Sequence, residues 1–188
     1  MCLSLTALGV SMIVTGQVGD GLEIISNNSF EEIQNENGAP SGWICNPAYK
    51  QAGTMRVVTE GAKDGKNSIE IATGPELLYA LCYKEPISVL PEDKIRLNVF
   101  VKGVGRFRVD LYLFCKSSSG GSNWWGRNIQ DEQVFEIDSD EWTSRSVEIE
   151  IPSEENGEGL KINGVKPALF ILPNSSLQFD CFTGTISK

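Results

Sequence analysis

The fold of this chain is decided by two neighbouring stretches, KIRLNVFVK at Lys94–Lys102 and RFRVDLYLFC at Arg106–Cys115. In both stretches apolar and polar residues alternate, and a period of two residues is that of a β-strand whose faces meet different surroundings. Further alternating or apolar runs, separated by Gly, Pro, Asn and Asp clusters, bring the count to roughly nine or ten strands. Helical periodicity is hard to find. The sequence therefore predicts an all-β protein, a jelly-roll β-sandwich of two antiparallel sheets.

The alternation also assigns residues to the two faces of each predicted strand. The apolar sets expected in the core are Ile95, Leu97, Val99 and Val101, then Phe107, Val109, Leu111, Leu113 and Cys115. The opposite faces mix charge with aromatic rings and carry Arg96, Asn98, Phe100 and Lys102, then Arg108, Asp110, Tyr112 and Phe114. Outward aromatic residues beside charged ones form either a platform for a ligand or ordinary cross-strand pairs. Both interpretations stay open.

Charge and composition exclude several classes of function. The 188 residues include 16 Lys and Arg against 25 Asp and Glu, with a formal net charge of -9 and no histidine. A nucleic acid is disfavoured as a partner, because phosphate binding depends on Lys and Arg. Without histidine, the usual general base, the Ser-His and Cys-His nucleophiles and the commonest transition-metal ligand are absent. An enzyme would be left with carboxylate or lysine chemistry.

The N-terminal segment has the character of a targeting signal. Leu3–Val14 is apolar and uncharged but too short to span a bilayer, and Val14 and Gly16 suit the small-residue positions before a signal-peptidase cut. Residues 1–16 are therefore predicted to be a signal peptide, so that the mature protein is secreted or at the cell surface and does not insert into the membrane. The alternative is a buried first strand of the core.

The cysteine count agrees with export. Five cysteines occur in the sequence, and removal of Cys2 with the signal peptide leaves Cys45, Cys82, Cys115 and Cys181. Two disulfides or buried free thiols are both compatible with this number, and the connectivity of a disulfide pair cannot be ranked from sequence. None of these residues forms a C-x-x-C motif, and without histidine a zinc site is disfavoured.

Several short motifs resemble those of a known family. Near the N-terminus these are Asn27–Glu32 (NNSFEE), Pro40–Trp43 (PSGW) and Gly61–Ile69 (GAKDGKNSI). Later matches, in the same order, are Pro91–Ile95 (PEDKI), Val101–Gly103 (VKG), Trp142–Thr143 and Phe179–Phe182 (FDCF). Together they resemble the carbohydrate-binding modules of families four and nine. The resemblance covers about residues 22–188, which we take as one domain; Asn28 and Cys181 depart from the family pattern.

The resemblance implies a jelly-roll domain that binds β-glucans, xylans or related polysaccharides without catalysis. It also implies a structural calcium ion, which takes six to eight oxygen ligands and needs no histidine. The matching positions are the carboxylates of Glu31 and Asp180, the backbone carbonyls of Ser29 and Lys66, and an oxygen of Asp64. Alternatively, Asp64-Gly65 is a simple turn and Glu31 a solvated residue.

Sugar rings stack on flat aromatic side chains, while polar side chains bind the hydroxyl groups. Trp124 and Trp125 are the strongest candidates, because they lie in a glycine- and serine-rich segment, SSSGGSNWWGRN, that we expect to be a loop. Trp43 and Trp142 are interpreted as structural. The candidates on the sheet face are Tyr79, Tyr83, Asn98, Arg108, Asp110 and Tyr112.

Two other functions fit parts of the pattern. A structural or adhesive surface domain of the same fold would bind a protein instead of a glycan. A glycosidase needs two carboxylates at a set separation, and Glu148/Glu150, Glu136/Asp138 and Asp138/Asp140 supply pairs. Alternating acids are, however, the ordinary pattern of a half-exposed strand. The favoured interpretation is a monomeric, non-catalytic glycan-binding domain for a neutral or weakly basic polysaccharide or oligosaccharide.

Overall fold

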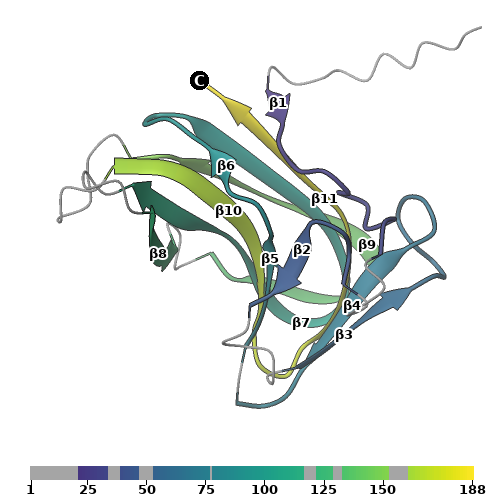
Figure 1. The fold of residues 1–188 in the computed structure, drawn as a ribbon. Coiled ribbons are helices and arrows are strands. Elements are labelled where there is room, and N and C mark those ends of the chain that lie inside the picture. Colours follow the sequence, from purple (N-terminus) through teal and green to yellow (C-terminus); the bar gives the residue numbers. More distant parts are fainter. Residues whose placement is uncertain are drawn as a thin grey trace, which may run out of the picture.

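The computed structural model describes residues 21–33, 39–46, 53–76, 78–116, 122–128, 133–152 and 161–188. Within these ranges the protein is all-β and contains no helix, which confirms the predicted fold class (Figure 1). The strands are β1 (Leu22–Glu23), β2 (Trp43–Cys45), β3 (Gly53–Val58), β4 (Ser68–Thr73), β5 (Tyr79–Tyr83), β6 (Ile87–Ser88), β7 (Lys94–Lys116), β8 (Ser122–Asn128), β9 (Phe135–Glu150), β10 (Lys161–Ile171) and β11 (Ser176–Ser187). The described ranges accordingly hold no helix that could cross a membrane.

Strand β7 connects the two layers of the sandwich. The strands follow the order β2-β5-β10-β7-β11-β4-β3. Outside this order, β1 pairs with β11, β6 pairs with β10, and β8 and β9 both pair with β7. The first half of β7, from Lys94 to Val104, pairs with β11, and its second half, from Phe107 to Lys116, pairs with β10. Because neighbouring strands twist relative to one another, this shared strand lets one antiparallel sheet curl over itself, as Figure 1 shows.

The sequence suggested two separate strands here, and the structure has one strand of 23 residues. Two glycines explain the difference, because Gly103 and Gly105 have φ angles of 114° and 142°. Positive φ is readily adopted only by glycine, so the chain bends at this corner without leaving the hydrogen-bonded ladder. Ser175, the residue just before β11, fixes the corner, because its Oγ accepts the backbone N–H of Arg106 at 2.9 Å.

The core lies between the layers and contains the apolar sets that the alternation predicts. Ile95, Leu97, Val99 and Val101 from the first half of β7 are fully buried. In the second half, the described members of the set, Phe107, Val109, Leu111 and Leu113, are also buried. Trp43, which we interpreted as structural, packs against Phe30, Tyr83 and Phe182 at centroid distances of 5.5, 5.4 and 5.1 Å. This burial supplies most of the stability of the fold.

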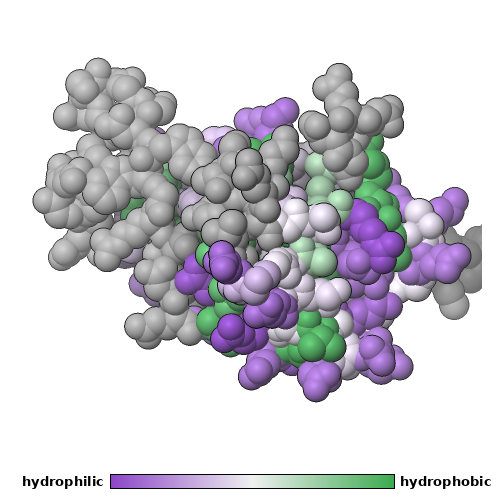
Figure 2. All heavy atoms as spheres, turned by 90° about the horizontal axis from the view of Figure 1, so that it is seen from below, coloured by the Kyte–Doolittle hydropathy of each residue, from purple (hydrophilic) through white to green (hydrophobic). Residues whose placement is uncertain are grey.

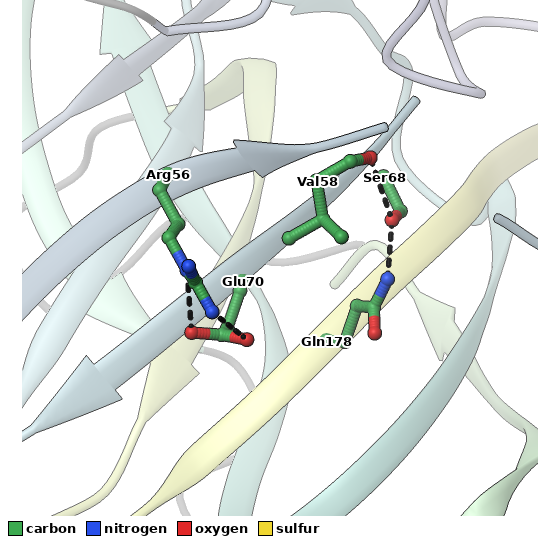
Figure 3. A network of polar contacts seen from close by, with 5 residues as sticks. All are labelled: Arg56, Val58, Ser68, Glu70 and Gln178. Carbon is green, nitrogen blue, oxygen red and sulfur yellow. Dashed lines mark hydrogen bonds and ion pairs between the residues drawn. The ribbon is translucent and has the colours of Figure 1, made fainter. Parts of the chain in front are cut away.

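Polar pairs on the outer face of β3, β4 and β11 fix the register of these strands (Figure 3). Arg56 Nε donates to Glu70 Oε1 at 2.8 Å across β3 and β4. Buried Ser68 donates its hydroxyl to Val58 O and accepts a bond from Gln178 Nε2 of β11. The Arg56 side chain is largely exposed, so we attribute a role in strand alignment rather than in stability to its ion pair.

The described surface shows no large apolar patch in the view of Figure 2, where separate hydrophobic groups lie among hydrophilic ones. Within the described part, the large hydrophobic residues that remain exposed are Leu22, Leu90, Val104 and Val134. Scattered residues of this kind are normal on a folded protein.

The described cysteines are free thiols, namely Cys45, Cys82 and Cys181. Cys45 and Cys82 lie on neighbouring strands, but the register places Ile44, not Cys45, opposite Cys82. Successive residues of a strand point to opposite faces, so Cys45 and Cys82 cannot be joined without moving the backbone. Of the two alternatives left by the sequence, these three residues follow the free-thiol one. Residues 1–16 and the side chain of Cys115 lie outside the described part.

Candidate functional site

The layer formed by β2, β5, β10 and the second half of β7 has a second apolar cluster on the side away from the core. It consists of Ala80, Cys82, Tyr112, Ala168 and Phe170, with Ile44 and Leu78 packed against it. Cross-strand register places Arg108 opposite Phe170, Asp110 opposite Ala168, and Tyr112 opposite Lys166. We call this side of the layer the aromatic face; Tyr112 and Phe170 on it are buried, at 5% and 2% exposure. Its candidate site residues are Arg108, Asp110, Tyr112, Phe114, Lys166 and Phe170.

Rings and cations are packed together on the aromatic face. The rings of Tyr112 and Phe170 lie 5.4 Å apart. The Arg108 guanidinium lies 5.2 Å from the centre of the Phe170 ring, and the Lys166 ammonium lies 5.1 Å from that of Phe114. Asn46 Nδ2 donates to the Tyr112 hydroxyl at 3.1 Å. Each ring and each cation therefore has a neighbour that holds it in place.

Charged groups on this face are unusually well buried. Asp110 is 0% exposed and accepts the N–H of Leu111 at 2.9 Å, and Lys166 is 8% exposed. Burial lowers the pKa of Lys166, and the neighbouring Glu85 and Cys82 act in the opposite direction. Buried charge is costly for a fold, and its concentration on one sheet face outside the core marks a candidate binding site.

The thiol on this face is unlike that of a catalytic cysteine. Burial raises the pKa of Cys82 to about 12, which outweighs the opposite effect of its hydrogen bond with Tyr112. A thiol with this pKa is protonated at neutral pH, whereas the thiolate is the nucleophile. Cys82 therefore contributes apolar surface to the site.

The predicted sheet-face residues fall into two groups. Arg108, Asp110 and Tyr112 lie together on the aromatic face. Tyr79 points into the main core, and Tyr83 packs on Trp43 and bonds to Ser26 through its hydroxyl at 2.7 Å. These two tyrosines therefore face away from the site.

Asn98 also lies apart from the aromatic face, because it belongs to the first half of β7, in the other layer. Its Oδ1 accepts the hydroxyl of Ser144 at 2.6 Å. The period of two residues assigns a side chain to one face of its strand, but it does not say which layer that strand half occupies. For this reason Asn98 and Tyr112 looked alike in the sequence.

Phe170 and Lys166 belong to the site and were not among the sequence-based candidates. They lie in β10, where Ala168, Leu169, Phe170 and Ile171 form a continuous apolar run. When both faces of a strand are buried, alternation disappears, and the sequence no longer says which residues face the core. Phe114 was assigned correctly to the outward face of its strand, but we did not select it as a ligand contact.

The segment with the tryptophan pair is a strand and not the loop that we expected. Strand β8 pairs with β7, so that the backbone of Trp124 lies opposite Phe114 and that of Trp125 opposite Leu113. Aromatic residues favour strands, and the neighbouring β7 offers a partner for the backbone. The side chains of both tryptophans lie outside the described part.

The predicted calcium ligands surround the turn at residues 61–67. Glu31 Oε1 accepts the backbone N–H groups of Lys66 and Asn67 at 2.9 and 2.8 Å. Asp180 Oδ2 accepts those of Lys63 and Asp64 at 2.7 and 3.0 Å. Burial raises the pKa of Asp180, partly offset by its backbone N–H donors. The two carboxylates thus tie the turn to the N-terminal segment and to β11.

The hydrogen bonds of Glu31 and Asp180 to the turn limit which ligands a metal ion could have there. The N–H groups of a turn form a site for an anion, here filled by Glu31 and Asp180. The described residues contain no group of three or more Cys, Asp or Glu side chains that could hold a metal. Most ligands of a calcium ion would therefore have to be backbone carbonyls, such as those predicted at Ser29 and Lys66.

Trp142, in β9, contacts the same turn. Its Nε1–H and the Nζ of Lys102 donate to the carbonyl of Gly61 at 3.1 and 3.2 Å. The Lys102 ammonium also lies 4.6 Å from the centre of the indole ring. Trp142 therefore holds the turn in place, in line with its interpretation as structural.

Comparison with known proteins gives the class of fold. No protein-family model matches the chain, and no curated protein matches it. Solved structures do match: the CBM22-1 xylan-binding domain of Paenibacillus barcinonensis Xyn10C has a TM-score of 0.59 and 15% identity, over 89% of this chain and 96% of that domain. The chain thus has the fold of β-sandwich carbohydrate-binding modules.

Two further structures show how widely this fold is used. The CBM22-1–GH10 modules of Clostridium thermocellum Xyn10B, complexed with xylohexaose, match with a TM-score of 0.61 and 15% identity, over 90% of this chain and 29% of that one. A Stig cyclase, Fisc from Fischerella sp. TAU, solved in complex with an indole compound, matches with a TM-score of 0.64 and 17% identity, over 89% and 98%. The modules among these matches are of family 22, so assignment to families four and nine stays a prediction.

Proposed function

We propose that the protein is an extracellular domain that binds a polysaccharide or oligosaccharide without catalysis, through the aromatic face. The observation that supports this most directly is the alignment of Tyr112, Phe114 and Phe170 with polar side chains on the outer side of one layer, where Phe114 is half-buried and Tyr112 and Phe170 are buried. Aromatic rings offer sugar C–H groups a flat apolar surface, and the surrounding polar groups can bind hydroxyls. The fold shared with xylan-binding domains gives the proposal further support.

A matched pair of phenylalanines tests the site. Phe114 and Phe100 are both half-buried, and each lies under a lysine, at 5.1 Å for Lys166 and 4.9 Å for Lys63. Phe114→Ala is expected to weaken glycan binding by about tenfold or more, because truncating a central aromatic contact costs above about 1 kcal/mol. Phe100→Ala, on the other layer, should leave binding unchanged.

The measurement is retention on insoluble polysaccharides, together with calorimetric titration of xylohexaose, for both variants and the wild type. Trp124→Ala is predicted to behave like Phe114→Ala. Equal losses in Phe114→Ala and Phe100→Ala would remove the aromatic face from the proposal. A blank result for the wild type on every polysaccharide would contradict glycan binding itself and favour a protein partner.

A second candidate function is binding or conversion of a small aromatic molecule. It is favoured by the similarity to the Fischerella cyclase, with its TM-score of 0.64, and by the burial of Asp110 on the aromatic face. The probe is 4-(1H-indol-3-yl)butan-2-one, the compound bound in a related cyclase structure. A raised unfolding midpoint with this probe, beside blank polysaccharide assays, would favour this candidate over the first.

We also propose a structural calcium ion at the turn of residues 61–67, held mainly by carbonyl oxygens and supported by the carboxylates of Glu31 and Asp180. A chelator is then expected to lower the unfolding midpoint by about 5 °C or more, because a bound ion stabilises only the folded state. Calcium, but not magnesium, should restore the midpoint. An unchanged midpoint would mean that the N–H bonds to Glu31 and Asp180 hold the turn without a metal.

A further inference from the structure

We draw no further inference here: the strongest candidate, the row of exposed carboxylates formed by Glu136, Asp138, Asp140 and Glu141 on strand β9, is an acidic cluster beside which the described part of the structure shows no second feature that points to a ligand or a partner.

Discussion

Gly103→Ala is expected to lower the free energy of unfolding by about 3–5 kcal/mol, from backbone strain and overpacking together. Gly103 has a φ of 114°, which L-residues rarely adopt. An added Cβ would overlap the carbonyl oxygen of Ser176 and lie 3.2 Å from the Cα of Leu177, both part of the facing strand. Because both neighbours are backbone atoms of β11, the strand cannot give way without breaking the ladder.

Chemical denaturation of Gly103→Ala and Gly74→Ala checks this prediction. A Cβ added at Gly74 would meet no atom within 4 Å, so the unfolding free energy of Gly74→Ala should lie within about 1 kcal/mol of the wild type or above it. Similar midpoints for the two variants would mean that β7 is not bent tightly at Gly103, and that the two layers are not connected as described here.

Trp43→Ala is the second large effect, and we expect it to cost about 3–5 kcal/mol of unfolding free energy. Trp43 is fully buried at the edge strand β2, between Phe30, Tyr83 and Phe182. These partners come from the N-terminal segment, β5 and β11, so removing the indole leaves a cavity where three parts of the chain meet.

Trp43→Phe is the matched control, and its expected cost is below about 2 kcal/mol. It keeps a ring in the cluster and removes the indole Nε1–H, which finds no acceptor within the described residues. Both variants are measured by urea unfolding followed by circular dichroism. Equal costs for Phe and Ala at this position would contradict the view that the ring, and not the indole N–H, carries the stability.

The structure also bears on how the fold relates to function. Xylan-binding domains and a Stig cyclase share it with this chain at 15% and 17% identity. A fold of this kind does not by itself fix a ligand. The proposed function therefore depends on the side chains of one sheet face and not on the fold alone.

The class of fold and the core could be read from the sequence because both depend on local alternation. Residues 94–115 carry the period of two, and the residues assigned to the core are buried along the described part of β7. The turn at residues 61–67 could likewise be predicted from its Asp64-Gly65 pair, since Gly65 has a φ of 64°.

The site could be predicted only in part. Arg108, Asp110 and Tyr112 were found because they alternate with core residues on one strand. Phe170 and Lys166 were missed, because β10 is buried on both faces and shows no alternation. The pairing of strands is a long-range property of the chain. This pairing placed Tyr79 and Asn98 away from the aromatic face.

The sequence by itself thus determined the class of the fold and the buried face of strands that alternate, such as the two halves of β7, since these follow from the two-residue period of side chains along a strand. Only the tertiary structure decided which faces meet. The bend at Gly103 and Gly105 places the two halves of β7 in different layers, and the pairing of β7 with β10 brings Arg108 to Phe170 and Tyr112 to Lys166. The physical reason is that alternation is encoded residue by residue, whereas the pairing of distant strands depends on packing of the whole chain.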